Sequence, residues 1–141
     1  MLSKHPGRCR FPHGHSRRIE VVIASPKLDA NDMVCDFKAV RYAVQDLVDR
    51  FDHAMALNSK DPFLATLADN PRLMERVITF EDTDPTTEVL ARHIYDALAE
   101  TIRTGREFRA PDGVTYRLPT HLMLERVRVG ETSSSWAEYG R

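Results

Sequence analysis

The sequence predicts an α+β fold in which two helices cover one face of an antiparallel sheet. Hydrophobic residues partly alternate along residues 17–25, as in a strand, and recur at spacings of three and four along two later segments, as in amphipathic helices. Further strand-like segments follow between residues 108 and 139. The order of strand, two helices and then strands is that of an α+β protein. A length of 141 residues suits a single domain, which we place at residues 1–141.

Composition excludes several classes of function. The net charge is −1, which gives no electrostatic basis for binding nucleic acid or an anionic membrane. No apolar run approaches the roughly 18 residues needed to cross a bilayer. Residues 1–11 are polar and basic, unlike a signal peptide, and two cysteines suit a reducing compartment better than a disulfide framework. We therefore expect a soluble, cytoplasmic protein with neither a nucleic acid nor a membrane as partner.

The first half of the chain predicts one strand and one helix. The strand spans residues 17–25, and its first face carries Ile19, Val21 and Ile23. A helix of about 14 residues is predicted by apolar residues at helical spacing, namely Phe37, Val40, Val44, Leu47, Val48 and Phe51. Asp36 is a plausible N-cap for this helix. Residues 52–84 are less regular, with a possible short strand at residues 77–80.

A second helix follows. Asp84 can cap it, Pro85 suits its first position, and Glu88 in the first turn favours the helix dipole. Its buried stripe is formed by Val89, Leu90, Ile94, Ala97, Leu98 and Ile102. Gly105 is a natural stop. These signals predict a helix that begins close to Asp84 and ends at Gly105.

Strands end the chain. Residues 108–116 predict a small hairpin around Asp112 and Gly113. A further strand is predicted at residues 122–130, and a short final strand at residues 136–139. The candidate core positions of the longer strand are Leu122, Leu124, Val127 and Val129.

The segment most indicative of chemistry lies just before the first strand. His13 and His15 are two residues apart, so in an extended chain both imidazoles lie on one side. Histidine is a preferred zinc ligand, and a catalytic zinc typically takes three protein ligands and a water. Cys9 lies upstream, where a nearby cation would favour its thiolate form. A His-x-His pair alone also fits two partly exposed histidines beside the basic residues Arg17 and Arg18.

Several separated motifs occur in an order and spacing that resemble the 6-pyruvoyltetrahydropterin synthase and 6-carboxytetrahydropterin synthase family. They are Cys9-x-x-x-His13-Gly14-His15, Asp36-Phe37, Phe51-Asp52-His53 with Leu57-Asn58, Pro85-Thr86-Thr87-Glu88, and Val129-Gly130-Glu131-Thr132. The resemblance covers roughly residues 9–140. The three residues between Cys9 and His13 resemble the bacterial carboxy-type enzymes of 7-deazaguanine and queuosine synthesis.

The resemblance implies a fold and an activity. The fold would be the tunnelling fold, an antiparallel four-stranded sheet with two helices on one face, assembled through a β-barrel into a homo-oligomer, a trimer or hexamer. The activity would be that of a zinc-dependent lyase acting on carbon–oxygen and carbon–carbon bonds. Its substrate would be dihydroneopterin triphosphate, and its product 6-carboxytetrahydropterin or 6-pyruvoyltetrahydropterin.

The resemblance also assigns residues. It implies that His13 and His15 are zinc ligands and that Cys9 and His53 are catalytic groups that exchange protons with the substrate, with Asp52 orienting His53. Glu131 would bind the pterin ring through two parallel N–H bonds, and Thr132 would add a hydrogen bond.

Other positions remain open between two interpretations. Thr86 and Thr87 fit contact with substrate, but the start of a helix explains them equally well. The basic residues Arg8, Arg10, Arg17 and Arg18 fit the binding of a triphosphate or, for most of them, a solvated surface.

One family feature has no counterpart in the sequence. The first zinc histidine of the family lies on an N-terminal strand about a dozen residues before the catalytic cysteine, a position that would fall before Met1. We expect that this strand is missing, which would expose a sheet edge. Three explanations are considered: a start further upstream, a site completed by His5 or water, or a diverged, non-catalytic pterin- or purine-binding homologue with an incomplete zinc site.

Overall fold

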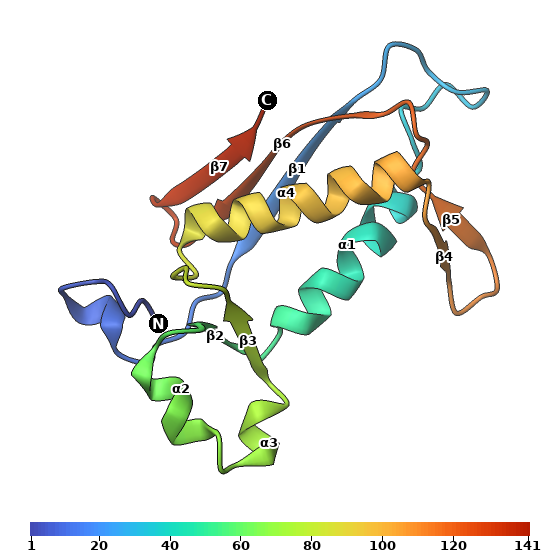
Figure 1. Ribbon diagram of the computed structural model, residues 1–141. Helices are drawn as coiled ribbons and strands as arrows, with labels where there is room; N and C mark the ends of the chain where they lie inside the picture. The colour runs from blue at the N-terminus through green and yellow to red at the C-terminus, as the bar shows by residue number, and fades with distance from the viewer.

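The centre of the molecule is an antiparallel sheet of three strands, formed by β1 (Arg18–Ala24), β6 (Met123–Gly130) and β7 (Trp136–Gly140). The strand order is β1-β6-β7 in this computed structural model, which describes residues 1–141. Strands far apart in the sequence therefore lie side by side, as Figure 1 shows. The sequence located all three strands to within one residue at each end.

Two helices complete the main layer, α1 (Phe37–Phe51) and α4 (Thr87–Thr104). Helix α4 lies against β6 and β7, and α1 packs against α4 (Figure 1). The predicted capping of α1 is confirmed, because the Asp36 side chain accepts a hydrogen bond from the Lys38 N–H at 2.7 Å. The predicted stop of α4 is also confirmed, since Gly105 adopts a left-handed conformation with φ of 63°.

The predicted start of α4 is wrong by two residues. Thr86, not Asp84, is the N-cap, and its hydroxyl accepts a hydrogen bond from the Val89 N–H at 3.3 Å. Pro85 precedes the cap and is not the first helical residue. The reason is that the Asp84 carboxylate binds groups elsewhere in the molecule, among them the Asn58 side-chain amide at 3.0 Å.

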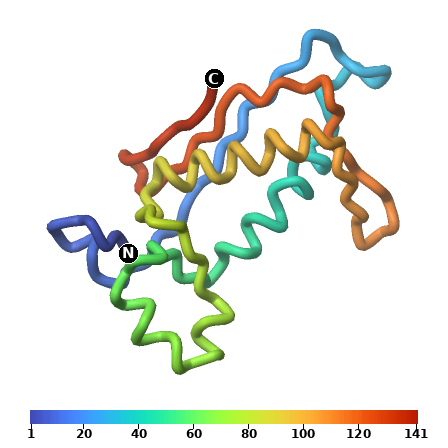
Figure 2. The backbone as a smooth tube through the Cα atoms, viewed as in Figure 1, coloured from blue at the N-terminus to red at the C-terminus, as the bar shows by residue number.

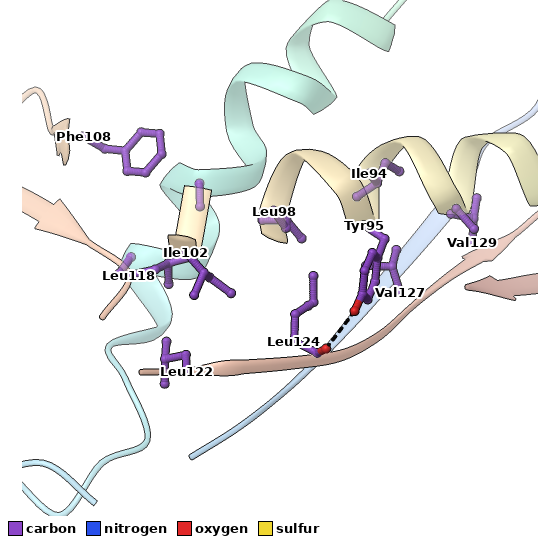
Figure 3. Packing of buried hydrophobic residues seen from close by; sticks show 13 residues of the cluster. Ile94, Tyr95, Leu98, Ile102, Phe108, Leu118, Leu122, Leu124, Val127 and Val129 are labelled. Carbon is purple, nitrogen blue, oxygen red and sulfur yellow. Dashed lines mark hydrogen bonds between the residues drawn. The ribbon is translucent and has the colours of Figure 1, made fainter. Parts of the chain in front are cut away.

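The core lies between α4 and the sheet. Figure 3 shows side chains of α4 pointing toward β6, with the Tyr95 hydroxyl donating to the Leu124 carbonyl at 3.2 Å. All four core positions predicted for β6 are buried, namely Leu122, Leu124, Val127 and Val129. Burying one such side chain stabilises the fold by about 1.5–3 kcal/mol. This packing fixes the first turn of α4 close to the end of β6.

Residues 52–84 contain more regular structure than the sequence indicated. The predicted strand at residues 77–80 is confirmed as β3 (Val77–Phe80), and it pairs in parallel with β2 (Met55–Asn58). Two short helices connect these strands, α2 (Pro62–Leu67) and α3 (Pro71–Met74). The predicted hairpin is confirmed as β4 (Glu107–Arg109) and β5 (Thr115–Arg117).

The four-stranded sheet implied by the family resemblance is not formed by this chain. The main sheet has three strands, and the parallel β2-β3 pair is a separate sheet. Residues 1–17 contain one short 3-10 helix, η1 (Arg8–Arg10), and no strand, because Pro6, Gly7 and Pro12 interrupt the segment. Figure 2 shows this N-terminal segment beside the segment that contains β2.

The sheet face away from α4 carries ion pairs between neighbouring strands. Arg128 of β6 contacts Glu138 of β7 at 2.9 Å and Glu20 of β1 at 3.6 Å. Such exposed pairs contribute little to stability. No helix is both long and apolar enough to cross a membrane.

Candidate active site

A cavity of about 960 Å³ lies where the N-terminal segment, the end of α1, the start of α4 and the β6–β7 turn meet. This volume is at the upper end of that of small-molecule sites. The structure brings six of the seven sequence-predicted site residues to its wall, namely Cys9, His13, His15, Asp52, His53 and Glu131. Residues more than 100 positions apart in the sequence therefore face one cavity.

Glu131 lies at the centre of a hydrogen-bonded group. It follows the last residue of β6, and one carboxylate oxygen, Oε2, accepts from the Thr87 hydroxyl at 2.5 Å. The other, Oε1, lies 3.1 Å from Nε2 of His15. The hydrogen bond from Thr87 is the main cause that holds the pKa of Glu131 below its ordinary value, with the charge of Arg17 adding to it. Glu131 is therefore held as a carboxylate that faces the cavity.

Helix α4 places Thr87 for this contact. Thr87 is the first residue of the helix, directly after the N-cap, and it is buried. The positive end of the helix dipole points at the region of Glu131, which favours a carboxylate there. Because α4 is fixed on β6 by the core, the separation of Thr87 and Glu131 follows from the packing of the fold.

Arg17 is the cation of the same group. Its Nη1 donates to the Thr87 hydroxyl at 2.8 Å and lies 4.0 Å from Oε2 of Glu131. Burial lowers the pKa of Arg17 from its usual value, and Glu131 opposes that shift. The sequence left Arg17 undecided, although strand-like alternation places it on the side of His13 and His15. That alternation is the signal by which Arg17 could have been found.

His13 and His15 lie next to each other. Their ring centroids are 4.9 Å apart and the rings are nearly perpendicular, although both residues precede β1 and are not part of a strand. Nδ1 of His13 lies 2.6 Å from the Phe11 carbonyl, and Nε2 of His15 faces Glu131. Burial lowers the pKa of His15 below its ordinary value. A neutral imidazole that donates through one nitrogen keeps a lone pair on the other, so each ring retains one possible metal-binding nitrogen.

The imidazoles of His13 and His15 are suitable zinc ligands, but they are only two. No group of three or more histidine, cysteine, aspartate or glutamate side chains is arranged to hold a metal ion. A catalytic zinc site typically has three protein ligands. The arrangement of His13 and His15 therefore falls short of a complete site.

Cys9 lies in η1, at the cavity wall. It is a half-buried free cysteine, and its carbonyl accepts a hydrogen bond from the Leu2 N–H at 2.8 Å. Residues next to Leu2 are tied to buried Asp84, whose carboxylate accepts from the Ser3 hydroxyl at 2.6 Å and the Lys4 N–H at 2.7 Å. Asp84 thus holds the segment that carries Cys9, a role that no pattern in the sequence indicated.

Asp52 and His53 form a pair at the end of α1. Nδ1 of His53 lies 2.9 Å from Oδ1 of Asp52. His53 has a left-handed backbone with φ of 53°, and this turn accompanies the contact between two adjacent side chains. Both side chains are exposed, 69% for Asp52 and 91% for His53.

Thr132 is the predicted site residue that does not reach the cavity. It lies in the β6–β7 turn beside a separate, smaller pocket that also contains Arg18 and Arg128. Its hydroxyl accepts a hydrogen bond from the Ser134 N–H at 3.2 Å, which is a contact within the turn. The threonine that contacts Glu131 is Thr87 and not Thr132.

Comparisons with known proteins identify the family of this chain. The sequence model of the family described as 6-pyruvoyl tetrahydropterin synthase matches residues 1–141. The 6-carboxy-5,6,7,8-tetrahydropterin synthase of Aquifex aeolicus is 30% identical over 137 residues, which cover 96% of this chain and 78% of that protein. The protein of the same name from Rickettsia felis is 28% identical over 116 residues, covering 82% and 83%.

A solved structure shows the same fold. An uncharacterized protein from Wolinella succinogenes superposes with a TM-score of 0.73 at 20% identity, covering 94% of this chain and 81% of that one. Its similarity concerns the fold alone. The match of the family model to the full length of the chain is decisive, and this chain belongs to the 6-pyruvoyl tetrahydropterin synthase family.

Proposed function

We propose that this chain is a pterin synthase-like lyase that acts on dihydroneopterin triphosphate, with 6-carboxytetrahydropterin as the expected product and 6-pyruvoyltetrahydropterin as the other candidate. The relatives named 6-carboxy-5,6,7,8-tetrahydropterin synthase support a pterin synthase-like function. The observation that carries the proposal is the single cavity that joins the carboxylate of Glu131 to Cys9 and His53. A ring-binding group and two proton-exchanging groups are what such a reaction needs.

Glu131 would bind the ring. A pterin presents its 2-amino group and N3–H side by side, and an ionised carboxylate accepts both. Thr87 and His15 hold the two carboxylate oxygens in place, which reduces the entropy that the side chain loses on binding. A ring bound in this way would turn its C6 side chain away from Glu131.

Cys9 and His53 would move protons. Loss of triphosphate breaks a C–O bond of the substrate side chain with its electron pair, and the neighbouring carbon must give up a proton. Cys9 would take or return such a proton at its sulfur. His53 would do so at its ring, with Asp52 accepting from Nδ1 and stabilising the protonated imidazole.

Zinc is a separate proposal. His13 and His15 would supply two ligands, with His5, which lines the same cavity, or water completing the set. His15 would have to bind the metal through Nδ1 or leave Glu131. Elemental analysis of the purified protein tests this: near-stoichiometric zinc that is lost in His13→Ala supports it, and a zinc-free protein after reloading contradicts it.

The assay for the main proposal uses the purified protein, with zinc added, and dihydroneopterin triphosphate. Released triphosphate and the pterin products are followed by chromatography. His53→Ala and Glu131→Gln should lose turnover, and Glu138→Gln, a carboxylate on the opposite sheet face, should retain it. Unchanged substrate in the presence of bound pterin would contradict the lyase.

That outcome would favour a second candidate, a non-catalytic pterin- or purine-binding protein. The observation in its favour is that the ring-binding end is cross-linked by hydrogen bonds, whereas no three-ligand metal group is formed. Absence of both pterin binding and turnover would contradict both candidates.

We also propose that the protein is a homo-oligomer. Strands β1 and β7 each pair only with β6, so the outer edge of each is unpaired. Trp136 and Tyr139 are exposed apolar side chains on β7. Unpaired edges of this kind favour pairing with another chain. Light scattering coupled to size-exclusion chromatography should give a trimer or hexamer, and a monomer at high concentration would contradict the proposal.

A further inference from the structure

We propose that Arg17 recognises the 4-oxo oxygen of the pterin ring, so that Arg17, Thr87 and Glu131 together bind one edge of the ligand. This inference rests on the proposed function and adds the residue that selects a 4-oxo ring. Its basis is the order of donors and acceptors in the cavity wall.

The hydroxyl of Thr87 fixes that order. A hydroxyl has one proton, and Glu131, as a carboxylate, only accepts, so Thr87 donates to Glu131. The same hydroxyl accepts from Nη1 of Arg17. The Thr87 oxygen thus lies between Arg17, which only donates, and Glu131, which only accepts. These two side chains cannot exchange their roles.

Arg17 has donors left over. A guanidinium group carries five N–H bonds, and the hydrogen bond to Thr87 is its only one in the protein. The side chain is 22% exposed and lines the cavity. A cation that has lost much of its water is stabilised by a further acceptor. The remaining N–H groups therefore favour a ligand oxygen beside Glu131.

The edge of a pterin ring matches this wall. Its 2-amino group and N3–H donate and suit Glu131, and the next atom along the edge, O4, accepts and suits a guanidinium. Nη1 of Arg17 and Oε2 of Glu131 are 4.0 Å apart, close enough to face one ring. One planar ligand edge can satisfy both groups at once.

The triphosphate is a poorer partner for Arg17. The Glu131 carboxylate beside the guanidinium repels phosphate oxygens. In addition, the triphosphate lies at the far end of the substrate from the ring edge that Glu131 would bind. Arg17 is therefore assigned to the ring and not to the leaving group.

A purely structural role for Arg17, that of holding Glu131 in place, makes a different prediction. In that case, removing the Arg17 side chain would weaken the binding of every ligand that Glu131 holds, and all to the same extent. If Arg17 instead donates to O4, removing its side chain would weaken mainly the binding of ligands that carry this oxygen. Two probes separate these cases: pterin, which is 2-amino-4-oxopteridine, and 2-amino-4-thioxopteridine, which keeps the 2-amino group and N3–H but has sulfur, a weak acceptor, in place of O4.

The experiment measures the dissociation constants of both probes by titration calorimetry, for the wild type, Arg17→Ala and Arg17→Lys. We expect Arg17→Ala to weaken pterin about tenfold or more, the range of a hydrogen bond to a charged group. Binding of 2-amino-4-thioxopteridine should change less than about threefold, because its sulfur is a weak acceptor, so the preference for the 4-oxo ring collapses. Arg17→Lys, which keeps the charge but loses the planar donors, should retain part of the preference.

The neighbouring arginine is the matched control. The side chain of Arg18 is 82% exposed, pairs with Glu20 and does not line the cavity, so Arg18→Ala should leave both constants unchanged. Thermal unfolding of each variant checks that it folds. Equal losses for both probes in Arg17→Ala would overturn this inference and leave the proposed function intact. A wild type that binds neither probe would overturn the proposed function and this inference with it.

Discussion

The two ends of the cavity differ in how firmly their side chains are held. At the end proposed to bind the ring, Glu131 contacts Thr87, His15 and Arg17. The Glu131 side chain is 31% exposed. The end proposed to exchange protons carries Asp52 and His53. The hydrogen bond between these two side chains is the only one that either of them makes. The first end is therefore organised before ligand arrives, and the second is not.

This difference separates binding from turnover. Held polar groups bind with little loss of side-chain entropy, whereas an exposed pair must first be fixed in place. A single chain thus holds the side chains proposed to bind the ring in place, whereas the pair proposed to exchange protons needs further contacts. We infer that a second copy, or the ligand itself, supplies those contacts.

The largest effect is expected at Glu131. Glu131→Gln keeps the shape but removes the charge that accepts two N–H bonds, so pterin binding should weaken by about 10- to 100-fold, as expected for a hydrogen bond to a charged group. Glu138→Gln is the matched control and should change binding less than twofold. Titration calorimetry measures both, and an unaffected Glu131→Gln would contradict the assignment of the ring-binding end.

A smaller loss is expected at Thr87. Thr87→Val keeps the volume and β-branching but removes the hydroxyl between Arg17 and Glu131. The affinity for pterin should fall about three- to tenfold, less than for Glu131→Gln, because Thr87 acts on the ring through Arg17 and Glu131 and not by its own contact. Thr87→Ser restores the hydroxyl and should recover most of that loss. If Thr87→Val and Thr87→Ser bind pterin with the same affinity, the hydroxyl does not organise this end of the cavity.

The pH dependence of stability should also single out this end. The pKa of Glu131 lies below its ordinary value of 4.5, so its stabilising contribution is present above pH 4.5 and is lost as the pH falls through the lowered pKa. The pKa of His15 lies below 6.5, so the unfolded state binds a proton first and stability falls as the pH drops below 6.5.

Urea unfolding between pH 3 and 7 measures these contributions. Glu131→Gln should flatten the loss of stability below pH 4.5. His15→Gln should flatten the loss that begins near pH 6.5. A His15→Gln variant whose stability changes with pH as much as that of the wild type would contradict the lowered pKa of His15.

The smallest effect is expected at the proton-exchange end. His53 is 91% exposed and bonds only to its neighbour, so His53→Ala should change the free energy of unfolding by less than about 0.5 kcal/mol and should leave pterin affinity unchanged. Turnover, by contrast, should be lost. A large loss of stability in this variant would show that the pair is held more firmly than its contacts indicate.

Most of the helices and strands that were predicted correctly follow from patterns within a single segment of the chain. Helix α1, β1 and β6 follow from hydrophobic periodicity within one segment, and the Asp36 cap from its position before the first apolar residue. The parallel pairing of β2 with β3 was missed, because it joins segments about 20 residues apart and each strand has only four residues.

Residue type and family pattern together selected residues that line one cavity, while their roles stay predictions. Glu131 and the histidine pair face the cavity as expected. Asp84 resembled a helix cap because an aspartate before a proline commonly is one, and only the tertiary contact with Ser3 and Asn58 reveals its other role. Thr132 lies in a turn whose direction cannot be deduced from the sequence.

The left-handed backbone of His53 has a consequence for selection experiments. A φ of 53° is free of steric cost only for glycine, so His53→Gly should stabilise the fold by up to about 1 kcal/mol. A library screened for heat resistance alone would therefore enrich glycine at this position and discard the imidazole. Variants of this protein evolved for thermal robustness should be sequenced at position 53 before they are used in any catalytic work.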